Sequence, residues 1–385
     1  MKILTICPRN PLTSRAWFVI FFTDGPEGTG SAEPRQPNTE NTRNRSTPAR
    51  HTVLLPPEPL HLLLSPVGPG MAIPGPAPFL AKIYPVGLVV ERVTPEKFEA
   101  AIAELRRRVT AAPVGLYGPD SVTWRVNRES LIFLGAGRAI LLQLAHPAVA
   151  QAIADHSRVT REPVGRFRRT FAQVFPMVFG SLEEAISVAW RVYRVHRRIQ
   201  GRLPDGAPYA ATDVDALVWV WATLTDTALL VYEKTVRPLT PSELRTYYTE
   251  SRLSMLLFGV FPEELPGSWA EFSAYFARRA AQLQVIPAAR RLADELFGLS
   301  PVLRPLLRAY RRFSAALLPE PLARGFGYVR DPAYAERIFR LARWVRPLLP
   351  PILRYLPPYL EAQARLHGRP AGPLVQLLKV WWVGG

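Results

Sequence analysis

Cysteine is almost absent from this 385-residue sequence, which contains one, Cys7. A disulfide within the chain is therefore excluded, and so is a metal site built from several thiolates. A single cysteine suits a reducing compartment without establishing one. Lysine is also scarce, with five among 48 basic residues, so the formal net charge of +17 comes from arginine.

So large a positive charge suggests nucleic acid, an anionic membrane surface or acidic ligands as partners. The sequence has no zinc-finger spacing and no aromatic RNA-recognition pattern, so we do not expect a nucleic-acid partner. A basic nucleic-acid module stays as a third hypothesis, which predicts salt-dependent DNA binding and no chromophore.

Motifs of common enzyme classes are missing too. Without an HExxH pair a zinc hydrolase is not expected, and without a GxSxG elbow an α/β-hydrolase triad has no nucleophile. Gly135-Ala136-Gly137 follows no strand, and Ile140 replaces the third glycine of the dinucleotide-binding fingerprint. We interpret these glycines as a close contact between helices.

Residues 1–70 lack a long apolar run and a regular apolar period. "AWFVIFF" at 16–22 has seven residues, too short to span a bilayer, and its flanks show no convincing signal-peptide cleavage site. "PRQPNTENTRNRSTPARH" cannot bury enough surface to fold. We expect 1–70 to be disordered or to precede a true start at Met71, and we expect a cytoplasmic protein without a transmembrane helix.

Residues 71–385 are expected to form one large all-α domain of about ten to twelve helices, because strand patterns are almost absent. Thr94 and a following proline begin a helix that extends towards residue 109. Asp120 is expected to cap a long helix over 121–146. Ser181 and Glu184 form a capping box for a helix that extends to about Gln200. Pro147 is expected to restart or kink the chain. Further helices are expected at 162–180, from Asp213 to the proline at 238, from Thr240 onward, and at roughly 268–284, 286–297, 301–316, 331–346 and 350–366.

One histidine lies on the apolar side of its helix. In "RVYRVHRRIQG", His196 continues the stripe of Ile186, Ala189 and Tyr193, so we expect its imidazole to point inward. A buried imidazole needs partners for both ring nitrogens. Two interpretations stay open: a core histidine bonded to a carbonyl, and an axial ligand of a haem iron.

The preceding helix, "GRFRRTFAQVF", has Arg166 and Thr170 on one face because residues four apart are neighbours. If that face is buried, the guanidinium needs an anion. A porphyrin propionate or dioxygen at a haem iron would serve, and so would an aspartate, Asp155, Asp213 or Asp226. Asp226 lies in an otherwise apolar segment and is expected to face a polar partner.

Several ordered motifs resemble one family. "GRAILLQLAHPAVAQAIADHS", "PVGRFRRT", "VFGSLEEAISVAWRVYRVHRRIQG" and "PYAATDVDALVWVWATLTDTALLVYE" are similar to the bacterial branch of the MpaB / rubber-oxygenase (latex-clearing-protein) catalytic-domain family. The resemblance covers roughly residues 120–285, and residues 300–385 form a C-terminal helical extension.

The resemblance implies a globin-like helical core that holds haem b and oxidises an apolar, isoprenoid or lipid alkene with dioxygen. His196 matches the family's iron ligand, and Arg166 and Thr170 match a pair near the haem, with catalytic and cofactor-binding roles. A family glutamate with a base-like role has no counterpart, since Gln143, His146 and Gln151 occupy that stretch. Trp221 stands where relatives often have a histidine. The alternative function is a non-catalytic helical haem- or lipid-binding protein.

The C-terminal region alternates apolar residues with arginine, as in "LARWVRPLLPPILRYLPPYL", and ends on two tryptophans. These helices either pack on the core or rest on an anionic membrane, where arginine meets phosphate and tryptophan lies at the interface. Peripheral membrane contact through this region would suit a lipid-like substrate.

Overall fold

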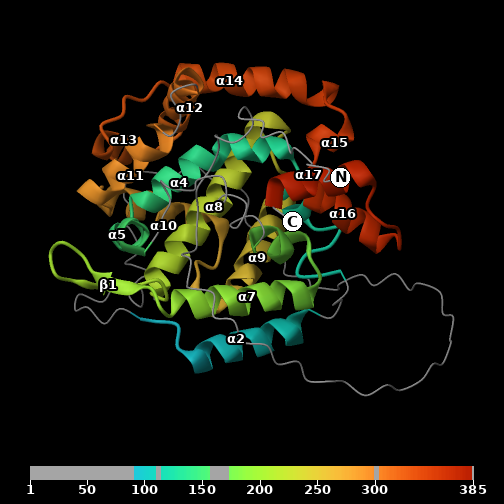
Figure 1. Cartoon of the computed structure of the whole chain (residues 1–385), viewed down its shortest axis with the longest axis horizontal. Helices are drawn as coiled ribbons and strands as arrows, with labels where there is room; N and C mark the ends of the chain where they lie inside the picture. Colours follow the sequence, from blue (N-terminus) through green and yellow to red (C-terminus); the bar gives the residue numbers. More distant parts are fainter. Residues whose placement is uncertain (1–90, 110–113, 157–172, 299–302, 384–385) are drawn as a thin grey trace, which may run out of the picture.

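The computed structural model describes residues 91–109, 114–156, 173–298 and 303–383. Within these residues the protein is almost wholly α-helical, with helices on all sides of a central one (Figure 1). The all-α prediction is therefore confirmed. The predictions about residues 1–70, Cys7 and Met71 lie outside the described residues.

The central helix is α8, Val214–Thr235. It packs against η1 (Ser130–Gly135), α4 (Ala136–Leu144) and α14 (Pro332–Val345). In the described part of the chain it is the one single helix long and apolar enough to cross a membrane, and 67% of its most apolar window is buried inside the protein. A helix that is apolar on most sides is typical of a protein core, which is where α8 lies.

The first helix, α2 (Pro95–Arg108), begins as expected, because the Thr94 hydroxyl accepts a hydrogen bond from the Lys97 amide at 3.2 Å. Its apolar face packs against η2 (Ser254–Phe258). It also meets α7 (Leu182–His196), where the rings of Phe98 and Tyr193 stack 4.1 Å apart. These contacts hold the last turn of α7.

The long helix expected over 121–146 is wrong. The chain forms α3 (Val122–Asn127), then η1 and α4, and Ser121 rather than Asp120 supplies the cap. The break falls at Glu129, whose backbone is extended and bridges Tyr355. Its buried carboxylate accepts two hydrogen bonds from Arg346, at 2.8 and 2.7 Å. This sequence-distant pair outweighs the local helical preference.

The helix expected to continue to Gln200 ends at His196, and residues beyond it form a small hairpin. Strands β1 (Gln200–Arg202) and β2 (Pro208–Ala210) pair antiparallel. Gly206 in the connecting turn has φ +88°, which glycine adopts without strain. The Pro-Asp-Gly sequence at 204–206 was a turn signal that the helical pattern overshadowed.

The helix expected over 350–366 is wrong in one respect, because extended residues Tyr355 and Leu356 divide it in two, and Tyr355 forms the bridge to Glu129. The other helix positions follow the expectations closely. Residues 173–179 are helical up to Gly180, and Thr240 with Glu243 forms a capping box. In the described residues twelve α-helices have nine residues or more, against the ten to twelve helices expected, and shorter helices bring the total above that number. The remaining elements are α5 (Pro147–His156), α9 (Pro241–Leu253), η3 (Pro262–Glu264), α10 (Trp269–Gln282), α11 (Pro287–Gly298), α12 (Arg304–Ala316), α13 (Glu320–Gly325), η4 (Arg346–Leu348), α15 (Pro351–Arg354), α16 (Pro357–Leu366) and α17 (Pro373–Val383).

The paired glycines allow close helix contacts, as expected. A Cβ atom at Gly135 would lie 2.5 Å from a Thr227 methyl group, and one at Gly137 would lie 2.1 Å from the Ser314 hydroxyl. The Gly137 amide also donates a hydrogen bond to the Tyr310 hydroxyl at 2.8 Å. Glycine therefore lets side chains of α12 pack directly on the backbone of α4.

Candidate functional site

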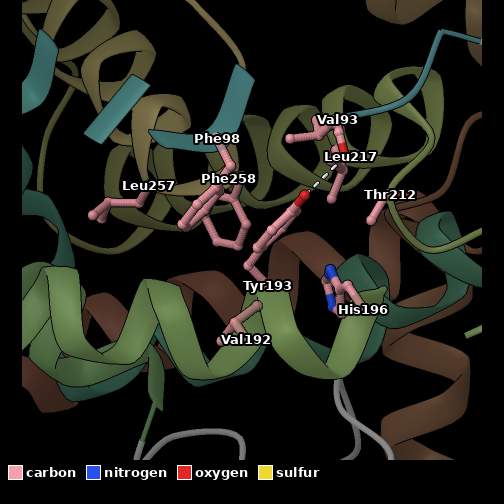
Figure 2. A pocket seen from close by; sticks show the side chains of 9 residues that line it. All are labelled: Val93, Phe98, Val192, Tyr193, His196, Thr212, Leu217, Leu257 and Phe258. Atoms are coloured by element: carbon pink, nitrogen blue, oxygen red, sulfur yellow. Dashed lines mark hydrogen bonds between the residues drawn. The ribbon is translucent and has the colours of Figure 1, made fainter. Parts of the chain in front are cut away.

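The helix that carries His196 is fixed at both ends. At its start the Ser181 and Glu184 side chains each bond the other residue's backbone amide, which confirms the expected capping box. Near its end Tyr193 stacks on Phe98 and donates a hydrogen bond to the Val93 carbonyl at 3.2 Å (Figure 2). These contacts set the direction in which the next turn presents its side chains.

His196 points inward, as its helical face predicted, and its exposed fraction is 6%. Burial lowers its pKa from the ordinary value of 6.5 to about 4, since the interior disfavours the charged imidazolium. The ring is therefore neutral near pH 7. A neutral imidazole has one nitrogen lone pair available for a metal ion, and the other nitrogen carries a proton that can orient the ring.

A small, partly open hollow lies beside His196 (Figure 2). Its lining is mostly apolar, and the hydroxyl groups come from Tyr193 and Thr212. The described walls leave room for about one water molecule, far less than the roughly 300–1,000 Å³ of a common small-molecule site. The nine lining residues are Val93, Phe98, Val192, Tyr193, His196, Thr212, Leu217, Leu257 and Phe258.

One wall of the hollow is built where two distant segments pair. The Val93 amide donates to the Thr212 carbonyl at 2.9 Å, and the Val214 amide donates to the Glu91 carbonyl at the same distance. Between them the Arg92 guanidinium bonds the Asp213 carboxylate at 3.0 Å. Burial raises the pKa of Asp213, and its bonds to the Ala210 amide and to Arg92 oppose that change. Asp213 therefore helps to hold together the two segments that form this wall of the hollow.

The other two predicted site residues, Arg166 and Thr170, lie outside the described residues, so their placement beside His196 stays a prediction. The three aspartates considered as partners for Arg166 each bond another residue. Asp213 bonds Arg92, and Asp155 accepts hydrogen bonds from Tyr209 and from Gln151, the latter at 2.8 Å.

Asp226, the third aspartate, pairs with Arg138 of α4 at 2.6 Å. This confirms the expected polar partner. The Arg138 side chain is 6% exposed, and it also donates to the Leu317 carbonyl at 2.9 Å and to the Thr227 hydroxyl. The guanidinium thus fixes α4 to α8 and to the end of α12, a role in holding the core together.

A second buried polar cluster was missed by sequence reasoning. The Nε2 atom of His146 lies 3.0 Å from a carboxylate oxygen of Asp215 and 3.0 Å from a guanidinium nitrogen of Arg279, which itself bonds Asp215. The Nδ1 atom of His146 is buried, with no hydrogen-bond partner in the described residues. The three residues come from the α4–α5 corner, α8 and α10, so no spacing in the sequence could have revealed the cluster.

This cluster and the hollow share one segment. Thr212 and Leu217 line the hollow, whereas Asp213 and Asp215, between them in sequence, bond Arg92 and the His146 cluster. Rigid hydrogen bonding of these two carboxylates therefore positions the wall opposite His196.

The stretch in which the family's glutamate has no counterpart contains Gln143 and Gln151, and the side-chain amides of both are already hydrogen-bonded. The buried Gln143 side chain donates to the Thr223 hydroxyl at 3.1 Å, and Gln151 donates to Asp155. Trp221, which replaces a histidine often found in relatives, is buried and donates from its indole to the Ser251 carbonyl at 3.0 Å. In the described residues, no group of three or more His, Cys, Asp or Glu side chains could hold a metal ion.

The fold and site define an all-helical protein with a neutral, buried histidine beside an apolar hollow. Residues 124–347 match the family described as "ER-bound oxygenase mpaB/B'/Rubber oxygenase, catalytic domain". Since the match covers more than half of the chain, the protein belongs to this family of oxygenase catalytic domains, which act in general on a small molecule with oxygen. No curated protein and no solved structure matches the chain.

Proposed function

We propose that the protein is a haem b-dependent oxygenase that acts with dioxygen on an apolar alkene such as an isoprenoid or lipid chain. One observation supports this more than any other. The buried imidazole of His196 is kept neutral by its surroundings and lies beside an apolar hollow, in a chain that belongs to an oxygenase family.

In this proposal the imidazole of His196 would hold the haem through the iron atom. Its neutral form is the one that binds metal, and its pKa of about 4 keeps that form dominant through the physiological range. The stacking of Tyr193 on Phe98 holds the last turn of α7, which carries the His196 imidazole. The haem, when bound, supplies the oxygen chemistry.

The remaining parts of the site have assigned tasks. Arg166 and Thr170 would donate hydrogen bonds to a propionate or to dioxygen, since both side chains carry donors and the guanidinium is permanently charged. The apolar side chains of the lining, including Val192 and Leu257, would exclude water and favour a hydrocarbon over a polar substrate.

The proposal is tested by the absorption spectrum of the purified protein after reconstitution with haem. We expect a Soret band that is shifted or lost in His196→Ala. His156→Ala is the matched control, because His156 bonds the Gln200 carbonyl at 3.2 Å and does not line the hollow. Absence of a Soret band in the wild type, or an unaltered spectrum in His196→Ala, would refute the assignment.

Oxygen uptake separates the oxygenase from a non-catalytic haem- or lipid-binding protein. The wild type should consume oxygen when an isoprenoid alkene is added, and Arg166→Ala should consume it at least about tenfold more slowly, as for other removals of a charged group at a reacting centre. A haem spectrum without oxygen uptake in the wild type would favour the binding protein.

A further inference from the structure

Helix α14 has apolar residues on two faces, and the core uses only one of them. Ala335 and Phe339 are buried, and the Phe339 ring contacts that of Phe313 in α12 with centroids 5.2 Å apart. Leu341 and Trp344 lie on the outer side with exposed fractions of 57% and 68%. Figure 1 shows α14 along one edge of the molecule.

The outer apolar face continues past the end of α14. Leu348, in η4, is 67% exposed, and Leu353, in α15, is 54% exposed. Large apolar side chains exposed one by one are ordinary, but a row of them along one edge marks a surface that contacts something apolar. We call Leu341, Trp344 and Leu348, together with Arg337, Arg340 and Arg343, the α14 rim.

The arginines of the rim form no ion pairs within the described part of the chain, whereas charged residues close to them do. Arg337, Arg340 and Arg343 are all exposed, and among the described residues none of the three forms an ion pair. Nearby, Arg346 pairs with Glu129, and Lys234 with Glu336. The rim therefore combines apolar side chains with three arginines that form no ion pair among the described residues, of which Arg337 lies within electrostatic reach of Asp331.

The rim is held in place and does not fray from the fold. Glu129 anchors Arg346 through two hydrogen bonds, and the Ser130 hydroxyl donates to the Leu353 carbonyl at 2.7 Å. The Leu356 amide donates to the Arg128 carbonyl at 2.9 Å. Because α14 packs on α8 and α12 and the segment after the rim is bonded to residues 128–130, the rim is preorganised, and a partner need not order it on binding.

Helix α17 also exposes apolar side chains and can be compared with the α14 rim. It exposes Leu374, Leu377 and Val380 by at least half, so it is similarly apolar. Its single charged residue is Lys379, which pairs with Glu361 at 2.7 Å. An apolar partner could contact either helix, whereas a partner that is both apolar and anionic is complementary only to the α14 rim.

We propose that the α14 rim docks the protein on the surface of a membrane that contains anionic lipids. Leu341, Trp344 and Leu348 enter the boundary between headgroups and acyl chains, where tryptophan is favoured. Arg337, Arg340 and Arg343 contact lipid phosphates, and their aliphatic stems remain in the apolar layer. This inference goes beyond the proposed oxygenase function and does not require haem.

The test is flotation of the full-length protein with two kinds of vesicle. One kind contains phosphatidylcholine alone, and the other contains phosphatidylcholine with about one third phosphatidylserine. We expect binding to the anionic vesicles only. A charge variant, Arg337→Gln with Arg340→Gln and Arg343→Gln, should bind at least about tenfold more weakly, since each basic residue near an anionic surface contributes about fivefold. An apolar variant, Leu341→Ser with Trp344→Ser, should also lose binding.

The matched control is Leu374→Ser with Leu377→Ser in α17, which removes comparable exposed apolar area and should bind as the wild type does. Every altered side chain is exposed, so the thermal midpoints should stay close to that of the wild type, and this is measured alongside. Equal binding by the wild type and the charge variant would overturn the proposal. So would loss of binding in the α17 control alone, or a wild type that ignores both vesicles and self-associates through the rim.

Discussion

Acidification should destabilise the protein through His196 more than through an ordinary histidine. The pKa of this imidazole is about 4 in the fold and 6.5 in an exposed chain. Between these two pH values the unfolded chain binds a proton that the folded chain does not. The stability contributed by the neutral, buried ring is therefore fully present above pH 6.5 and is lost as the pH falls towards 4.

The size of the effect follows from the two pKa values. At about 1.4 kcal/mol for each pH unit between 6.5 and 4, the loss is about 3 kcal/mol. Many carboxylates also titrate in this range, so the wild type is compared with His196→Gln, a variant with a neutral polar side chain that keeps every other titrating group. The contribution of those groups cancels in the difference between the two proteins.

The assay is denaturant unfolding of protein prepared without haem, at several pH values from 7 to 4. The difference in unfolding free energy between the wild type and His196→Gln should shift by about 3 kcal/mol over that range, with the wild type losing more. If the two curves stay parallel within about 0.5 kcal/mol, the imidazole is solvated in the fold and the reasoning fails.

Three further predictions concern contacts between helices elsewhere in the fold. Gly137→Ala should cost about 1–3 kcal/mol in unfolding free energy, because the added Cβ would lie 2.1 Å from an oxygen of α12, whereas Gly298→Ala, which meets nothing within 4 Å, should be neutral. Arg138→Met should lower the unfolding free energy by about 3 kcal/mol. In a double-mutant cycle with Asp226→Asn, the two changes should show a coupling energy above about 1 kcal/mol. Additive effects of the two changes would contradict the ion pair. Glu129→Gln should speed hydrogen exchange of the amides in η4 and α15, and unchanged exchange would show that the carboxylate does not hold them.

The helix starts could be predicted because their determinants are local. Thr94, Ser181 and Thr240 each bond an amide three residues further on, and such contacts can be read from a few neighbouring letters. The inward direction of His196 was predictable for the same reason, since the helical period alone places it with Ile186 and Tyr193.

The errors occur where distant residues decide the local structure. Nothing near Glu129 in the sequence reveals that Arg346 bonds its carboxylate, so the break between α3 and η1 was missed. The end of α7 at His196 depends in part on the pairing of β1 with β2, whose turn was overlooked.

The sequence by itself determined the all-helical class, most helix boundaries, the family and the burial of His196, because each depends on periodicity, caps or motif order. Only the tertiary structure decided that His146, Asp215 and Arg279 meet, that Arg138 bonds Asp226, and that part of the C-terminal region keeps its arginines unpaired beside exposed apolar residues. Those arrangements join residues tens to hundreds of positions apart. Their geometry is fixed by how the helices pack and not by any local pattern in the sequence.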